Sequence, residues 1–394
     1  MTGSLMEDQT WCSNNYYLLQ GGVYVGDWPD GGTEVTLTIQ AGTKIYGDTT
    51  QTSFLSVQRD ARCIAVGTPY EPILMTSGKE EGQRARGDWG GLIINGNAPL
   101  NSGAEASGEG ETGMYGGNDG SDDSGVYQYI RVEFAGQQLT PDNELNGIAF
   151  QGVGSGTTID HLHVHMGQDD GIEFFGGEAE WKYLITTGIG DDNLDWTDGW
   201  AGKGQFFVSQ HFDDESDQGI EADNNGDDNS ATPFSDPILS NLTLVGVADS
   251  EASDIGALLR EGTKGDISNM ILTDFNDACL DVDHQQTWDN VDDGSLSVTY
   301  SILDCATNYA DNGEDDPDGV SVEDFFTDGT GNSAVDPDLG DNYLPNSGSP
   351  ALGNGSSPSD SFFDAADYIG AVGPDNDWVT QGVSDGWINF SALN

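Results

Sequence analysis

The sequence predicts an all-β fold, a parallel β-helix in which the chain winds into a solenoid with two or three short strands per coil. Short runs of alternating apolar and polar residues end in Gly, Asp or Asn turns along most of the chain, and helical periodicity is almost absent. One strand pattern also recurs at steps of about 22 to 26 residues, which is typical of a solenoid repeat. A two-sheet sandwich would leave this phased repeat unexplained.

Two kinds of strand alternate through the repeat. The first comprises GGLII, NGIAF, DGIEF, DNLDW, QGIEA, IGALL and DACLD, which start at positions 90, 146, 170, 192, 218, 255 and 277. The second includes YIRVEFAG, IDHLHVHMG, KYLITTG, GQFFVSQHF and LSNLTLVG. Two longer steps coincide with Gly- and Asp-rich stretches at 101–125 and 223–237, which we interpret as loop insertions.

The ends of a solenoid need covers, because uncapped coils expose strand edges that invite aggregation. We assign residues 1–20 to an N-terminal cap, residues 21–355 to the β-helix with its two insertions, and residues 356–394 to a C-terminal cap segment. The aromatic residues expected to close the C-terminal end are Trp378, Trp387 and Phe390.

The charge of the chain restricts its partners. Its 394 residues include 69 Asp and Glu against 11 Lys and Arg, a formal net charge of -58. Nucleic acid and anionic membranes are therefore not expected as partners. No apolar window is long enough for a transmembrane helix, so membrane insertion is not expected either. The start MTGSLMEDQTW lacks the features of a signal peptide, although we expect an exported protein.

Acidic residues are phased to the repeat. Equivalent residues of successive coils lie about 4.8 Å apart in such a fold, so Glu173, Asp195 and Glu221 would form one outward column. Two carboxylates about 5 Å apart repel by roughly 1 to 3 kcal/mol. Bridging Ca²⁺, which prefers carboxylate and carbonyl oxygens, would offset this repulsion.

The sequence therefore predicts bound Ca²⁺ as a stabilising ion. The first expected ligand set comprises Asp169, Asp170, Asp191, Asp192, Asp195 and Asp198. The second comprises Glu173, Asp217, Glu221 and Asp223. The alternative is a solvated acidic face of a halophilic protein, which would hold no specific cation.

Four cysteines allow two disulfides, and pairing is the default in an exported protein. Cys279 and Cys305 are about one coil apart, so they are expected as vertical neighbours within disulfide reach. Cys12 and Cys63 would form the second bond and would pin the N-terminal cap to the first coils.

The strand HLHVHM places His161, His163 and His165 on one face. Aligning neighbouring coils puts Glu133 beside His165 and Arg131 beside His163. A zinc site made by His163, His165 and Glu133 is a conceivable second metal site. Three solvent-facing imidazoles are the favoured alternative, because a neighbouring arginine repels a cation.

Several segments resemble secreted right-handed parallel β-helix proteins of marine and Bacteroidetes-type bacteria, which have a pectate-lyase-like solenoid. They include LTIQAGTKIYGD, VQRDARCIAVGT, GDWGGLIINGNAPLNS, NELNGIAFQGVGSGTTIDHLHVH and GDDNLDWTDGWAGKGQF. The resemblance covers most of residues 20–245, and the tail NYLPNSGSPALGNG is similar to β-helix C-termini. It implies a right-handed solenoid and export to the cell surface or beyond, and it leaves the biochemical role open.

We favour a binding or matrix role, with a polysaccharide or a cell-surface component as partner. Trp89 and Trp200 lie in Gly-rich turns, where they could stack on sugars. Arg260 would sit beside an outward apolar patch formed by Leu258 and Leu280. Together with Ca²⁺, this patch would hold a glycan that carries carboxylate or sulfate groups.

The enzymatic alternative is a calcium-dependent polysaccharide lyase. Such an enzyme needs a base to abstract a proton beside the uronate, and Arg260 and Lys264 are weak candidates for it. An inverting glycoside hydrolase is less favoured, because QDDGIEFFGG lacks the companion motifs found in polygalacturonases.

Overall fold

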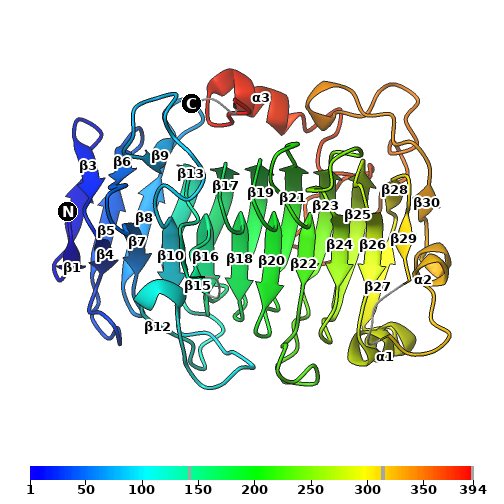
Figure 1. The fold of residues 1–394 in the computed structure, drawn as a ribbon, viewed down its shortest axis with the longest axis horizontal. Helices are drawn as coiled ribbons and strands as arrows, with labels where there is room; N and C mark the ends of the chain where they lie inside the picture. The colour runs from blue at the N-terminus through cyan, green and yellow to red at the C-terminus, as the bar shows by residue number, and fades with distance from the viewer. Residues whose placement is uncertain (141–142, 312–315, 392–394) are drawn as a thin grey trace.

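The computed structural model describes residues 1–140, 143–311 and 316–391. Figure 1 shows a single elongated solenoid whose coils stack side by side from the N-terminal strands to the coils near α1 and α2. Every pairing within the two long sheets is parallel, as between β18 and β20 or between β17 and β19. The predicted parallel β-helix is therefore confirmed.

One strand from each coil enters an 11-stranded sheet, called sheet 1 here. Its strands are, in spatial order, β1 (Gly3–Leu5), β4 (Gly22–Val25), β7 (Phe54–Val57), β10 (Leu92–Asn95), β16 (Ile148–Gln151), β18 (Ile172–Phe175), β20 (Leu194–Thr197), β22 (Ile220–Ala222), β24 (Ile255–Leu259), β26 (Ala278–Val282) and β29 (Tyr309–Ala310).

The remaining strands of the coils form a 15-stranded sheet, called sheet 2. Its main path is β2 (Gln9–Trp11), β5 (Thr36–Ile39), β8 (Arg62–Val66), β13 (Gly125–Glu133), β17 (Thr158–His165), β19 (Glu180–Thr187), β21 (Lys203–Gln210), β23 (Ile238–Val245), β25 (Gly265–Thr273), β28 (Ile302–Asp304) and β30 (Ser333–Ala334). Off this path lie β3 (Tyr16–Leu19), β6 (Lys44–Gly47), β9 (Ile73–Ser77) and β27 (Leu296–Thr299).

Alternation along each strand builds the core. In sheet 1, Ile172, Leu194 and Ile220 are paired across neighbouring coils and are fully buried. The rings of Phe150 and Phe174 stack with centroids 5.0 Å apart, and Trp200 continues the stack at 4.5 Å. Phe150, Phe174 and Trp196 occupy equivalent positions of successive coils, whereas Trp200 reaches the stack from the turn after β20, so large ring surfaces are removed from water along the axis.

The long strands of sheet 2 bend at one residue each. At equivalent positions Tyr129, His161, Tyr183 and Phe206 have positive φ, between 51° and 68°. This conformation is costly for residues with a Cβ. Here, ring stacking along the column, with centroids 4.4 to 4.8 Å apart, accompanies it.

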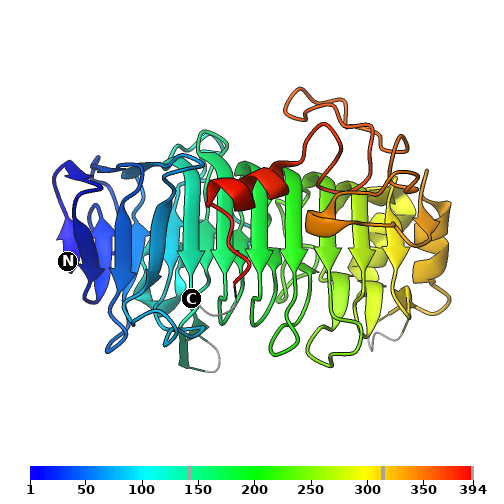
Figure 2. The ribbon, with the colours of Figure 1, turned by 90° about the horizontal axis from the view of Figure 1, so that it is seen from above.

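The C-terminal segment, residues 335–391, runs back along the outer face of sheet 2, as Figure 2 shows for the red helix α3 (Trp378–Asp385). Trp378 and Trp387 pack there with Ile185, Phe206 and Val208. The prediction that residues 356–394 close the end of the solenoid is therefore wrong for residues 356–391, and residues 392–394 lie outside the described part of the chain. The segment covers apolar side chains on the outer face of sheet 2 that would otherwise face water, and α1 (Gln285–Asp293) and α2 (Val322–Asp328) lie near the end of the solenoid instead.

Residues 1–20, assigned to a cap, contain β1, β2 and β3, which pair with β4, β5 and β6. The 101–125 insertion contains the hairpin β11 (Ala106–Ser107) and β12 (Met114–Tyr115) and the short helix η1 (Glu109–Glu111). A second hairpin pairs β14 (Gln138–Thr140) with β15 (Asn143–Glu144), and η2 (Asp341–Tyr343) lies in the C-terminal segment. In the described part of the chain, no helix is long and apolar enough to cross a bilayer.

The cysteines form one of the two expected disulfides. Cys279 and Cys305 are bonded, with Cα atoms 5.6 Å apart, as expected for neighbouring coils. Cys12 and Cys63 are free thiols, so the predicted bond between them is wrong. Strand β5 lies between β2, which ends just before Cys12, and β8, which contains Cys63, and this intervening coil holds the two thiols apart.

Candidate cation site

The acidic turns stack directly before sheet 1. Gly171 makes this close stacking feasible, because a Cβ at its position would lie 2.6 Å from the carbonyl oxygen of Asn193 in the next coil. The backbone N–H of Asp192 donates to Asp170 Oδ1 at 3.1 Å, and the N–H of Gln218 donates to Asp192 Oδ1 at 2.7 Å. Each turn therefore uses one carboxylate oxygen to hold the next coil and leaves the other oxygen available.

The outward acids of sheet 1 follow the predicted register. Glu173 pairs with Asp195, and Asp195 pairs with Glu221. The column continues with Leu258 and then Asp281, whereas Leu280 pairs with Ala257 on the inner side. The predicted apolar patch of Leu258 and Leu280 is thus wrong, because β26 pairs with β24 one residue later than the repeat suggests, and Leu258 is itself only 6% exposed.

Seven of the ten predicted ligands meet in three linked groups, in each of which one carboxylate oxygen per residue lies within 4.8 Å of the others. The groups are Asp169, Asp170 and Asp191; Asp170, Glu173 and Asp195; and Asp191, Asp192 and Asp217. Since Asp170 and Asp191 are each shared between two groups, the groups form a continuous chain along the solenoid axis. This grouping differs from the two sets expected from the sequence, because Glu173 joins Asp170 rather than Asp217.

These carboxylates are buried without cationic partners. Asp170, Glu173, Asp192 and Asp195 are each less than 10% exposed. Among the described residues, no Lys or Arg forms an ion pair with any member of the three groups. Asp195 Oδ1 is buried and accepts no hydrogen bond. Buried charge is costly unless it is paired or bound to a metal, so this site calls for either protons or a cation.

The pKa values of the cluster reflect this burial. Loss of solvation, followed by repulsion from Asp191, raises the pKa of Asp169 to about 8. The pKa of Asp217 rises to about 6 for the same reasons. Burial and neighbouring carboxylates also raise the pKa values of Asp170, Glu173, Asp192 and Asp195 well above the usual range. A divalent cation would reverse these shifts by favouring the ionised carboxylates.

The three remaining predicted ligands lie outside the groups. Arg260 binds Glu221 and also Asp223, with its Nε 2.9 Å from Asp223 Oδ1. Asp198 lies beyond the end of β20, where the Tyr115 hydroxyl donates to it at 3.4 Å. Arg260 thus neutralises one end of the acidic column, and its pKa is raised by both carboxylates despite its burial. A guanidinium held in this way is a poor catalytic base.

Three residues that line the site were not predicted from the sequence. The Asn146 amide donates to Glu173 Oε2, and Asn146 belongs to the coil before Asp170. Glu109 of the first insertion and Glu144 of β15 act on Asp169 by repulsion, which indicates that both lie close to it. The alignment of LNGIAF with DDGIEF could have indicated Asn146, whereas the loop residues follow no repeat and carry no comparable signal.

The two insertions also meet beside the acids. Asn101 Nδ2 donates to Asn224 Oδ1 at 2.9 Å, and Asn225 Nδ2 donates to Asn101 Oδ1 at 2.9 Å. These contacts between the insertions lie near Arg260, whose partner Asp223 directly precedes Asn224. The insertions thus meet at the Arg260 end of the acidic column, while Asp169, Asp191 and Asp217 remain partly exposed as a rim.

The histidines do not form a zinc site. His163 and His165 are fully buried, and their expected solvent exposure is also wrong. The Asn389 N–H donates to His163 Nδ1, so His163 Nε2 donates to Thr187 Oγ1 at 2.9 Å. Thr187 in turn donates to His165 Nδ1, and His165 Nε2 donates to the Ser391 carbonyl. All four ring nitrogens are therefore occupied.

Glu133, the third expected zinc ligand, is engaged elsewhere. Arg131 Nε lies 2.6 Å from Glu133 Oε1, and the Thr76 hydroxyl donates to Glu133 Oε2 at 2.9 Å. The arginine that repels a cation near His163 therefore also neutralises this carboxylate. The hypothesis of a zinc site is overturned by these contacts.

The other predicted binding residues have structural roles. Trp89 and Trp200 are fully buried, and their indole N–H groups donate to the carbonyls of Glu133 and Ala179. They therefore cannot stack on a sugar, because the Gly-rich turns fold them into the core. Lys264 Nζ lies 4.3 Å from the centre of the Phe234 ring, in a cation–π contact.

Comparison with known families gives one match. The family described as the pectate-lyase like beta helix domain matches residues 3–342, which is most of the chain. No curated protein and no solved structure matches the chain.

Proposed function

The chain belongs to the pectate-lyase-like β-helix family, and from this premise we propose that it is an extracellular, calcium-stabilised module that binds acidic carbohydrate. Membership of the family supports a carbohydrate-related role in broad terms. The observation that carries the proposal is the chain of seven carboxylates, several of them buried, that no Lys or Arg of the described residues neutralises. Ca²⁺ suits this site because it accepts many oxygen ligands in flexible geometry.

Bound Ca²⁺ would have one role at the buried carboxylates and another at the partly exposed ones. Around Asp170, Glu173 and Asp195 it would offset repulsion between buried carboxylates and so stabilise the stacked coils. Along the partly exposed rim of Asp191 and Asp217 a bound ion could keep free coordination positions. A carboxylate or sulfate of a glycan could complete that coordination, although the protein surface is itself strongly negative.

Binding of a uronate or sulfated oligosaccharide, measured by calorimetry with and without Ca²⁺, tests this proposal. We expect Ca²⁺-dependent binding in the micromolar-to-millimolar range, weakened at least about tenfold by Asp191→Asn combined with Asp217→Asn, because ion binding at the rim requires both carboxylates. Asp27→Asn, an exposed acid of an early coil, is the matched control and should bind normally. Binding that persists after chelation would refute the bridging role.

The same samples separate binding from catalysis. A lyase releases unsaturated sugars that absorb in the ultraviolet, and we expect none over hours of incubation. The reason is that Arg260 is held by two carboxylates and its pKa is raised, so it does not release a proton to become a base. Appearance of unsaturated product that requires Ca²⁺ would establish a polysaccharide lyase instead.

A further inference from the structure

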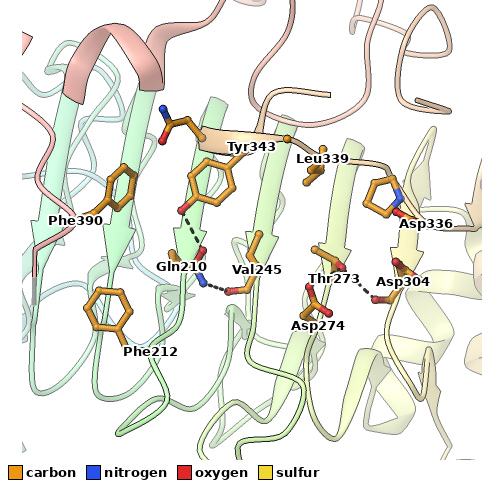
Figure 3. Close-up of a pocket in the computed structure, with 13 residues that line it drawn as sticks. Gln210, Phe212, Val245, Thr273, Asp274, Asp304, Asp336, Leu339, Tyr343 and Phe390 are labelled. Atoms are coloured by element: carbon orange, nitrogen blue, oxygen red, sulfur yellow. Dashed lines mark hydrogen bonds between the residues drawn. The ribbon is translucent and has the colours of Figure 1, made fainter. Parts of the chain in front are cut away.

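A separate cavity lies between sheet 2 and the C-terminal segment (Figure 3). Its volume is about 550 Å³, which is within the usual range for ligand pockets. It shares no lining residue with the three carboxylate groups described above. One end of its lining is aromatic and the opposite end is acidic, which restricts the ligands that would fit.

The floor of the cavity consists of the ends of four neighbouring strands. Gln210, Val245, Thr273 and Asp304 are paired in register from β21 to β28. Three coil spacings correspond to about 14 Å along the solenoid axis. The floor is thus an elongated track with amide, apolar, hydroxyl and carboxylate side chains in that order, as Figure 3 shows.

One end of the cavity is aromatic. Phe212, Tyr343 and Phe390 gather there (Figure 3), and the rings of Tyr343 and Phe390 have centroids 6.2 Å apart. The Tyr343 hydroxyl donates to Gln210 Oε1 at 3.1 Å, which fixes the ring over the floor. Phe212 and Phe390 are only partly buried, so their ring faces could still contact a ligand. Such rings pack well against the C–H faces of sugars.

The opposite end is acidic. Asp274, Asp304 and Asp336 line it, and none of the three forms an ion pair with a Lys or Arg of the described residues. Burial, followed by repulsion from Asp336 and Asp274, raises the pKa of Asp304. A ligand with a positive charge at this end would relieve the repulsion.

We propose that this cavity binds a short carbohydrate that carries a protonated amine, with the amine at Asp274, Asp304 and Asp336 and a sugar face on the rings of Phe212 and Phe390. Between the two ends lies Thr273, whose hydroxyl donates to Asp274 Oδ2 and to the Asp304 carbonyl and can still accept a hydrogen bond from a sugar hydroxyl. A simple polyamine would pair with the carboxylates but would offer no sugar face to the rings of Phe212 and Phe390. The site therefore prefers a charge opposite to that of the glycan expected at the calcium rim.

Calorimetry with a glucosamine disaccharide tests the proposal, and the N,N′-diacetyl disaccharide is the matched probe because it keeps the sugar rings and loses the charges. We expect the amino sugar to bind at least about tenfold more tightly, and Asp304→Asn with Asp336→Asn to remove most of that preference. Asp27→Asn changes the net charge by one unit outside the cavity and should leave binding unchanged. Thermal unfolding of each variant checks that the fold is retained.

Chelation of Ca²⁺ at a temperature where the fold persists should not weaken this binding, which separates the result from that at the calcium rim. Equal affinity for the two disaccharides would overturn the role of the carboxylates. Equal or tighter binding of spermidine, with displacement of the amino sugar, would show that the cavity recognises amines without sugar contacts and would overturn the carbohydrate assignment. Absence of binding at millimolar amino sugar would overturn the whole proposal.

Discussion

At the scale of single residues, the sequence predicted the identity and phase of most of the acidic cluster. Glu173, Asp195 and Glu221 follow the predicted register because strand alternation and the repeat together fix each position. Residues whose contacts come from a distant segment of the chain could not be placed from the sequence. Nothing near His163 in the sequence indicates that Asn389 and Ser391 cover the histidines. Trp89 and Trp200 were misplaced because Gly-rich turns can fold large rings inward.

The cluster carboxyls should make the stability of the calcium-free protein depend on pH. The pKa of Asp169 rises from 3.8 to about 8, and that of the neighbouring Glu221, which lies outside the groups and pairs with Arg260, rises from 4.5 to about 8. A group with a raised folded pKa contributes stability that is present below its unfolded pKa and is lost as the pH rises through its folded pKa. The melting temperature without Ca²⁺ should therefore fall between about pH 6.5 and 8.

Calorimetric scans across this range with chelator, repeated with saturating Ca²⁺, measure the effect. Burial lowers the pKa of His165 below its ordinary value of 6.5. Above pH 6.5 the buried histidines therefore contribute little to the change of melting temperature with pH. Bound Ca²⁺ requires ionised carboxylates, so the fall should disappear or reverse with the ion. A flat profile without Ca²⁺ would mean that the carboxyls are solvated at neutral pH.

The disulfide gives a second prediction at residue scale. Thiol titration of the unfolded protein without reductant should find two free groups, those of Cys12 and Cys63. Cys279→Ser should destabilise the protein by about 3 kcal/mol, because the bond closes a loop across 26 residues of sequence separation. Four titratable thiols would contradict the bond, and the matched Cys63→Ser variant should keep it.

At the scale of elements, each coil was predictable and the C-terminal segment was not. Strand positions follow from alternation and turn residues, so the repeat from β16 to β26 could be assigned from the sequence. The long-range packing of α3 on sheet 2 has no periodic signal, since it depends on which apolar side chains of β19 and β21 remain uncovered. The aromatic residues of the segment indicated that it packs, without indicating where.

Hydrogen bonds connect His163, Thr187 and His165 to Asn389 and Ser391 of the C-terminal segment, a series called the histidine relay here. We expect the segment to detach locally when this relay is broken. Thr187→Val removes the hydroxyl that links His163 to His165, and it leaves two buried ring nitrogens without partners. An unsatisfied buried group costs about 1 to 3 kcal/mol. Hydrogen exchange of residues 387–391 should therefore accelerate about 5-fold or more, a change of about 1 kcal/mol in opening.

Thr186→Val is the neighbouring control, since its hydroxyl donates to Asn193 in the turn before sheet 1. It should leave the exchange of residues 387–391 unchanged while it loosens the turns around the acidic groups. Equal acceleration of residues 387–391 in both variants would show that the relay does not hold the segment.

At the scale of the whole molecule, the solenoid stacks acidic turns at coil spacing although like charges repel. A formal net charge of -58 opposes compactness, and the buried part of that charge is concentrated on one side of sheet 1. The fold class could be predicted from the repeat alone. Whether the acids are buried could not, because burial depends on insertions such as 101–125 that lie outside the repeat.

The most direct test of this account is thermal unfolding of the chelated and the calcium-reconstituted protein at neutral pH and equal ionic strength. A cation that binds only the folded chain raises the melting temperature, here by about 5 °C or more. The combined variant Asp170→Asn and Asp192→Asn should lose most of that difference, since both residues belong to the groups. Coincident transitions with and without Ca²⁺ would contradict the account and would leave a solvated acidic face.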